Sequence, residues 1–193
     1  MIAHHQAESC LDPIGLSQQP LLETARLLLR RPGLKDADAI ASVLGQHETA
    51  RMLPSLPFPY DRQDALEWLL PRASGVLPGW TFAITRAGND TMIGAVTVER
   101  RVGRWVLGYW LAPEFRGQGL MGEALDAVVH EFFEELPAES LQASVLADNP
   151  ASFALQARLG FRITGCRDVY CNARGAMKTM LETVLHHQDL PAH

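Results

Sequence analysis

A glycine-rich loop near the middle of the chain constrains the fold more than any other feature of the sequence. It reads Ala112-Pro-Glu-Phe-Arg-Gly-Gln-Gly-Leu-Met-Gly122, between a β-rich segment and a strongly amphipathic one. A helix that leaves such a loop presents unpaired backbone N–H groups at its positive end, and glycines let a large anion approach them. The loop therefore predicts a phosphate or pyrophosphate ligand. The alternative is a tight strand-to-helix turn whose glycines only supply positive φ angles.

The segments around the loop predict one mixed α/β domain. Three runs of β-branched and aromatic residues, separated by turn signals, predict consecutive antiparallel strands at residues 80–85, 92–99 and 105–112. Residues 118–136 predict a helix with one apolar face. That face consists of Leu120, Ala124, Leu125, Val128, Val129, Phe132, Phe133 and Leu136. Further elements are predicted in the order strand, helix, strand, strand, at residues 141–146, 150–159, 162–170 and 176–185.

The first third of the chain predicts a strand and two helices. Residues 25–31 form a short apolar run with basic ends, which Pro32-Gly33 stops. Residues 36–47 have apolar residues at helical spacing. Asp61 is a good N-cap for a second helix, which we expect to end near Leu70 because Pro71 follows. The proline-rich segment between the helices, residues 53–59, is incompatible with regular structure.

Composition limits the classes of function. The chain has 193 residues and a formal charge of −5, which fits a single domain and argues against a nucleic-acid partner. No apolar run is long enough to span a bilayer, so no membrane partner is expected. Three cysteines cannot all pair, no secretory signal is recognisable, and a cytoplasmic location is expected. No Cys or His spacing matches a metal site. We expect an arm at residues 1–20, the domain at 21–187 and a tail at 188–193.

Two other anion-binding motifs compete for the glycine loop. A Walker A loop is excluded because no Gly-Lys-Ser/Thr follows. A dinucleotide fingerprint is the stronger rival, since Gly117, Gly119 and Gly122 satisfy G-x-G-x-x-G and Asp148 follows the next predicted strand. This fingerprint would indicate a dinucleotide-dependent oxidoreductase. Two observations argue against that class: the strands before the loop look antiparallel, and too few residues follow Asp148 to complete a doubly wound sheet.

The segment Gly108-Tyr-Trp-Leu-Ala-Pro-Glu-Phe-Arg-Gly-Gln-Gly-Leu-Met-Gly-Glu-Ala-Leu125 resembles the acyl-CoA-binding core of the GCN5-related N-acetyltransferase (GNAT) family. Asn149-Pro-Ala-Ser152 with Leu159-Gly-Phe161 resembles its second signature, and residues 23–30 resemble the first strand of the branch that acetylates ribosomal-protein N-termini. The resemblance implies a single α/β (α+β) domain whose mixed, mostly antiparallel sheet is flanked by helices and splayed at the acyl-CoA site. It assigns acyl-CoA binding to Leu111, Ala112, Arg116, Gly117, Gln118, Gly119, Leu120, Met121, Gly122, Asn149 and Ser152.

The resemblance also implies direct transfer of an acetyl group from acetyl-CoA to a primary amine, without a metal. Ser152 is the candidate acid for the departing thiolate, and Glu99 is the candidate base, directly or through water. Met121 departs from the small residue usual at its position. Arg158 is one of several arginines for the 3′-phosphate, and residues 48–79 would form the acceptor wall. The acceptor, a protein N-terminus or a small amine, stays open, as does the choice between monomer and homodimer. An acyl-CoA sensor without activity is the alternative.

Overall fold

The computed structural model describes residue 16 and residues 18–191, so most of the predicted arm and the last two residues of the predicted tail lie outside the described residues. In this part of the chain, one eight-stranded sheet has the strand order β1-β2-β3-β4-β5-β6-β8-β7. Its strands are β1 (Leu22–Glu23), β2 (Leu27–Arg30), β3 (Gly79–Arg86), β4 (Asn89–Arg101), β5 (Arg104–Leu111), β6 (Ser140–Leu146), β7 (Arg162–Cys171) and β8 (Ala176–His186). The α-helices are α1 (Ala37–Leu44), α2 (His47–Ala50), α3 (Arg62–Ala73), α4 (Leu120–Glu135) and α5 (Pro150–Arg158).

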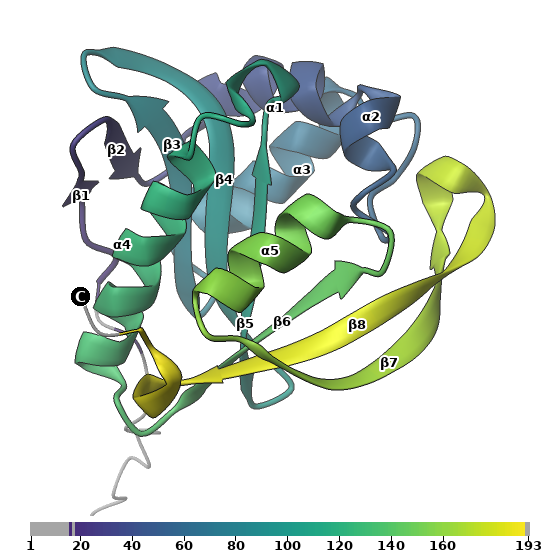
Figure 1. Cartoon of the computed structure of the whole chain (residues 1–193). Helices are drawn as coiled ribbons and strands as arrows, with labels where there is room; N and C mark the ends of the chain where they lie inside the picture. Colours follow the sequence, from purple (N-terminus) through teal and green to yellow (C-terminus); the bar gives the residue numbers. More distant parts are fainter. Residues whose placement is uncertain (1–15, 17, 192–193) are drawn as a thin grey trace, which may run out of the picture.

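The sheet is antiparallel except at its centre. β3, β4 and β5 form a continuous meander, as the sequence predicts, and β4 pairs with β5 from Gly94↔Leu111 to Arg101↔Arg104. β5 and β6 are parallel, and their register contains only Trp105↔Leu141 and Val106↔Gln142. Beyond these pairs β5 continues on β4 while β6 continues on β8, and Figure 1 shows the two strands diverging. The predicted splayed sheet is thus present.

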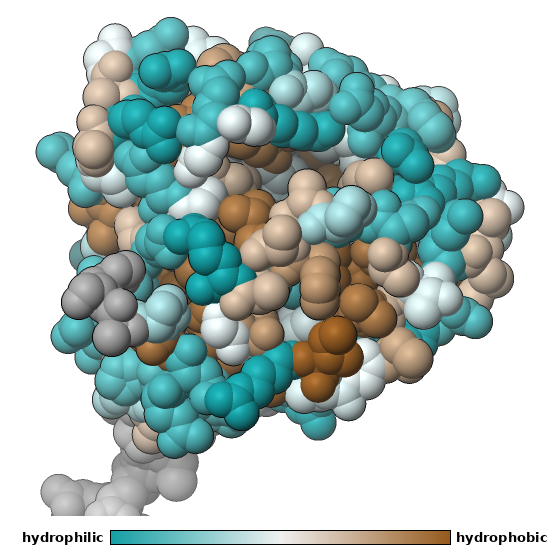
Figure 2. Space-filling model, in the orientation of Figure 1, coloured by the Kyte–Doolittle hydropathy of each residue, from teal (hydrophilic) through white to brown (hydrophobic). Residues whose placement is uncertain are grey.

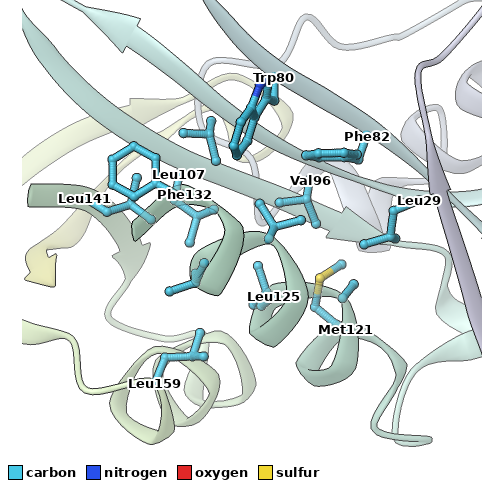
Figure 3. Packing of buried hydrophobic residues seen from close by; sticks show 14 of the residues in the cluster. Leu29, Trp80, Phe82, Val96, Leu107, Met121, Leu125, Phe132, Leu141 and Leu159 are labelled. Atoms are coloured by element: carbon cyan, nitrogen blue, oxygen red, sulfur yellow. The ribbon is translucent and has the colours of Figure 1, made fainter. Parts of the chain in front are cut away.

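Helices cover both faces of the sheet. Alternation along β3 sends Phe82 and Ile84 to one face and Ala83 to the other. α4 packs its predicted apolar face on the first face, and Figure 3 shows Leu125 and Phe132 beneath Trp80 and Val96 of the sheet. α1 and α3 cover the second face, and α5 lies on the same side as α4 (Figure 1).

Two helix predictions need correction. α3 begins after the predicted N-cap Asp61, whose side chain accepts hydrogen bonds from the backbone of Gln63 and Asp64, but the helix continues through Pro71 to Ala73. A proline in the last turn removes only one helical hydrogen bond, and Arg72 anchors that turn by donating to the Trp68 carbonyl at 2.8 Å. The helix predicted at 36–47 is divided into a 3₁₀ turn (Leu34–Asp36), α1 and α2.

Residues near both described ends pack against the domain. Leu16 and Leu190 contact the larger hydrophobic core. The Gln19 side chain bonds both backbone groups of Thr81 within β3: its amide nitrogen donates to the carbonyl at 2.8 Å, and its amide oxygen accepts from the N–H at 3.0 Å. Among the described residues, no helix has the length and apolar character needed to cross a bilayer.

Candidate functional site

The divergence of β5 and β6 opens a cavity of about 700 Å³. Its walls come from β5, from the loop before α4 and from the start of α5, where they include Tyr109, Gly119 and Ser152. In Figure 2 this face of the molecule is hollowed, and apolar residues lie inside the hollow. The edge of β5 from Leu107 to Leu111 faces the cavity without strand pairing on that side. Free backbone groups at such an edge are available to an extended ligand.

The glycine loop ends at one mouth of this cavity. Gly117 and Gly119 have φ angles of 72° and 75°, a conformation that only glycine adopts easily, and Gly119 is the N-cap of α4. The first helical hydrogen bond runs from the Glu123 N–H to the Gly119 carbonyl. The N–H groups of residues 120–122 precede that bond and have no partner within the helix, so the anion site that the sequence predicts here stays a prediction that this geometry permits.

Three arginines surround the loop, and one of them was not predicted. Arg26, immediately before β2, donates to the Gln118 carbonyl at 2.9 Å and forms an ion pair with Glu123 at 2.6 Å. Sequence alone does not reveal this residue because it lies 92 positions before the Gln118 that it binds. Arg158 forms a 3.0 Å ion pair with Asp126.

Arg116 lines the cavity, but its guanidinium already has several protein partners. It donates to the Leu111 carbonyl at 3.1 Å, to Glu48 at 3.1 Å and to the Thr49 hydroxyl at 2.9 Å. These bonds fasten the loop to α2. A direct bond from Arg116 to a pyrophosphate stays a prediction.

Met121 and Gly122 complete the first turn of α4. Met121 is 7% exposed, and Figure 3 shows its side chain with the core residues beneath the sheet. The core therefore accommodates the larger side chain at position 121. A Cβ at Gly122 would lie 2.7 Å from Nη2 of Arg158, the end of a flexible side chain that is 53% exposed and can shift, so close packing alone does not require glycine here.

Asn149 and Ser152, both predicted site residues, lie near Tyr109, a residue that no sequence motif marks. Asn149 caps α5 by accepting a 3.2 Å hydrogen bond from the Ser152 backbone. The Ser152 hydroxyl lies 2.6 Å from the hydroxyl of Tyr109 on β5. Nothing in the sequence assigns Tyr109 a role, since a tyrosine in a β-rich segment is typical of a strand packed in the core. Tyr109 packs on the same core as α4 and Leu155 of α5, which places its hydroxyl beside Ser152.

Glu99 lies elsewhere, which argues against its predicted role as a base. Its side chain is 10% exposed, forms ion pairs with Arg72 at 2.6 Å and Arg101 at 2.7 Å, and borders a different cavity. Burial acts to raise the pKa of Glu99, but the hydrogen bond from Arg101 and the charge of Arg72 outweigh it and hold the pKa below its usual value. A carboxylate held in this way is a poor proton acceptor. β4 continues past it to Arg101, so it is not at the strand end either.

A second cavity of about 400 Å³ lies against the first and shares Thr97, Gly108 and Trp110 with it. Its other wall comes from the proline-rich segment and α3, the region predicted to face the acceptor. Tyr60 lines it, and within the described part of the chain the buried Tyr60 hydroxyl has no hydrogen-bond partner. Burial and the nearby Asp64 raise the pKa of Tyr60 to about 12, so the phenol stays protonated. Asp64 and Glu67 add two carboxylates to this cavity.

Comparisons with known proteins agree with this geometry. A family model described as an acetyltransferase (GNAT) domain matches residues 26–162. The chain is 26% identical over 165 residues to the uncharacterized N-acetyltransferase YoaA of Bacillus subtilis, covering 81% of this chain and 90% of that protein. It is 33% identical over 81 residues to the ribosomal-protein-serine acetyltransferase of Escherichia coli, covering 40% and 45%.

A solved structure shows the same fold. RimJ of Mycobacterium smegmatis, in complex with CoA-disulfide, matches with a TM-score of 0.70 and 22% identity, over 86% of this chain and 84% of that one. Since the family model covers well over half of the sequence, the chain belongs to the GNAT family of acetyltransferases. The sheet is neither doubly wound nor parallel, so the dinucleotide-binding alternative is wrong, and Asp148 instead forms an ion pair with Arg174.

Proposed function

We propose, from membership of the GNAT family as the premise, that this protein transfers the acetyl group of acetyl-CoA directly to a primary amine. One observation carries the proposal: β5 and β6 separate after two residue pairs, and the resulting cavity ends at the bare N-terminus of α4. RimJ of M. smegmatis, which has this fold, was solved with CoA-disulfide. The pyrophosphate would bind the N–H groups of residues 120–122, and the pantetheine arm would lie along the free edge of β5.

The residues of the cavity support a direct mechanism. A neutral amine attacks the thioester carbonyl, the C–N bond forms, and the C–S bond breaks with its electron pair going to sulfur. The amine loses one proton and the thiolate gains one, with Ser152 as the proposed donor to sulfur. A thiol with a pKa near 8.5 is a tolerable leaving group, so the donor contributes modestly to the rate.

The second cavity favours an acceptor with an α-amine and a peptide carbonyl. Arg72 and Arg101 also line this cavity but are ion-paired with Glu99. The carboxylates of Asp64 and Glu67, in contrast, can attract a cationic amine. The Tyr60 hydroxyl, which has no partner among the described residues, offers a hydrogen bond to a carbonyl oxygen. An α-amine has a pKa of about 7.7–8.0 and is partly neutral near pH 7, so it needs no strong base. An acceptor that needs no strong base fits a protein in which Glu99, the predicted base, is ion-paired with two arginines. The E. coli relative named as a ribosomal-protein-serine acetyltransferase supports a protein acceptor.

The test is an acetyl-transfer screen that follows CoA release and identifies products by mass spectrometry. The panel contains peptides with a free N-terminus, the same peptides with a blocked N-terminus and an internal lysine, polyamines and amino acids. We expect transfer to the free α-amine, with a rate that rises through pH 7–8 as that amine loses its proton. Transfer only to polyamines or amino acids would contradict the peptide acceptor. Tight acetyl-CoA binding without transfer to any member would favour the sensor.

A further inference from the structure

A chain of hydrogen bonds runs from β8 through α5 to β5 and ends at the larger cavity. Thr183 Oγ1 donates to Gln156 Oε1 at 2.9 Å, and Gln156 Nε2 donates to the Tyr109 hydroxyl at 3.2 Å. The Tyr109 hydroxyl lies 2.6 Å from Ser152 Oγ. Thr183 and Gln156 are 3% and 1% exposed, whereas Ser152 lines the cavity. The chain therefore connects the buried interior to the point where the proposed acid acts.

The chemistry of its members gives this chain a direction. An amide oxygen only accepts hydrogen bonds, so Thr183 donates to Gln156, whose nitrogen is left to donate to Tyr109. The Tyr109 oxygen accepts that bond and has one proton of its own. A phenol is a stronger acid than an aliphatic hydroxyl, so this proton belongs to the 2.6 Å bond with Ser152 Oγ and not to the 3.3 Å contact with the Ser152 carbonyl. The proton of Ser152 is then free to point into the cavity.

We infer that Tyr109 is a positioning residue that directs the Ser152 proton at the sulfur of the acyl donor. The inference rests on the proposed function, which places that sulfur in the cavity. Each hydrogen bond polarises the next donor, so the buried chain strengthens the bond that Ser152 offers to the thiolate. When Ser152 gives its proton to sulfur, the proton that leaves the attacking amine restores it through solvent, and the protons balance.

The charge state of Tyr109 agrees with this role. Burial acts to raise the pKa of Tyr109 and prevails over the opposing effect of its hydrogen bonds with Ser152 and Gln156. The phenol therefore stays protonated and remains a donor at neutral pH. The direction also explains why Gln156, a buried amide, lies between two hydroxyl groups: an amide can accept from one and donate to the other.

The experiment follows the thiol of bound CoA, so it needs no acceptor. A hydrogen bond to a thiolate favours the charged form and lowers the thiol pKa. Ultraviolet absorbance of the thiolate against pH should give bound CoA a thiol pKa about one unit below that of free CoA. Tyr109→Phe and Ser152→Ala should each remove this shift, and calorimetry should give Tyr109→Phe a CoA affinity within about threefold of the wild type. Tyr170→Phe makes the same chemical change at a tyrosine that is 57% exposed, and it should keep the shift.

Several outcomes would overturn the inference. If Tyr109→Phe retains the lowered pKa of the bound CoA thiol, then Tyr109 does not direct the Ser152 proton, and the inference is wrong. A variant that no longer binds CoA makes Tyr109 structural. Once an acceptor is known, losses of kcat in Tyr109→Phe and Ser152→Ala should not add in the double variant, and additive losses would contradict a shared role. If the wild type does not bind CoA, the proposed function fails instead, so the two failures are distinguishable.

Discussion

The two edges of β5 differ although they belong to the same eight residues. On the β4 side, every residue from Arg104 to Leu111 has a partner, and the sheet there is a continuous antiparallel meander. On the β6 side, pairing stops after two residues, and a cavity of about 700 Å³ takes its place. The closed edge holds the domain together, and the open edge leaves backbone groups for a ligand. Stability and binding are therefore separable in this protein, and substitutions on the two sides should affect different measurements.

The largest effect is expected for Glu99→Gln, on the closed side. Glu99 is paired in the β4 register with Val106 of β5 and is bound by two arginines. Removing one partner of a buried ion pair leaves the other charge uncompensated and lowers the free energy of unfolding by about 3 kcal/mol or more. Chemical denaturation measures this, and acetyl-CoA affinity should stay unchanged. Glu182→Gln is the control, because its pair with Arg167 is about half exposed and contributes less than about 1 kcal/mol.

Glu99→Gln should also change how the free energy of unfolding decreases at acidic pH. The pKa of Glu99 is lower in the folded protein than its usual value of 4.5, so near that pH the unfolded chain binds more protons. Stability from Glu99 is therefore present above about pH 4.5 and is lost as the pH falls through the folded pKa. Glu99→Gln should lose less stability than the wild type over that range. An identical decrease at acidic pH in both proteins, or weaker acetyl-CoA binding by the variant, would break the separation of the two edges.

Gly119→Val tests the open side. A β-branched residue at a φ of 75° strains the loop and turns its N–H groups away from an anion, so acetyl-CoA affinity should fall about 100-fold. Gly103→Val is the matched control: its φ is 76°, it lies in the turn between β4 and β5, and a Cβ there meets no atom within 4 Å. The control should strain the turn but keep the affinity measured by calorimetry. Unchanged affinity in Gly119→Val would contradict the pyrophosphate assignment.

Substitution of Asn149 is expected to have the smallest effect. It sharpens the comparison because this residue contributes to stability, as the cap of α5, and is also predicted to bind the ligand. Asn149→Ala removes the cap of α5 and should lower the free energy of unfolding by about 1 kcal/mol. Asn149→Asp keeps an oxygen for the cap but loses the amide donors. If Asn149 also binds the pantetheine, the Asp variant should retain stability in denaturation and still lose about tenfold in acetyl-CoA affinity. If Asn149→Asp and the wild type bind acetyl-CoA equally well, Asn149 acts only as the cap of α5.

The sequence by itself determined the elements whose cause is local. Periodicity predicted the apolar face of α4, and turn residues predicted the β3–β5 meander. The glycines before α4 have positive φ, and Asn149 and Asp61 cap their helices because caps depend on residues one turn away. Local signals failed at Pro71, where contacts of Arg72 with Trp68 and Glu99 extend the helix that the proline alone would end.

Only the tertiary structure decided which side chains meet. Arg26 reaches the glycine loop from the first described strands, and Tyr109 reaches Ser152 across the gap between β5 and β6. The tertiary structure also buries Glu99 between two arginines, and a carboxylate held there is a poor base. Such encounters depend on the path of the whole sheet, and pairs of residues 43 to 92 positions apart have no spacing that a sequence pattern records. The cavity exists because two strands diverge, and divergence is a property of neither strand alone.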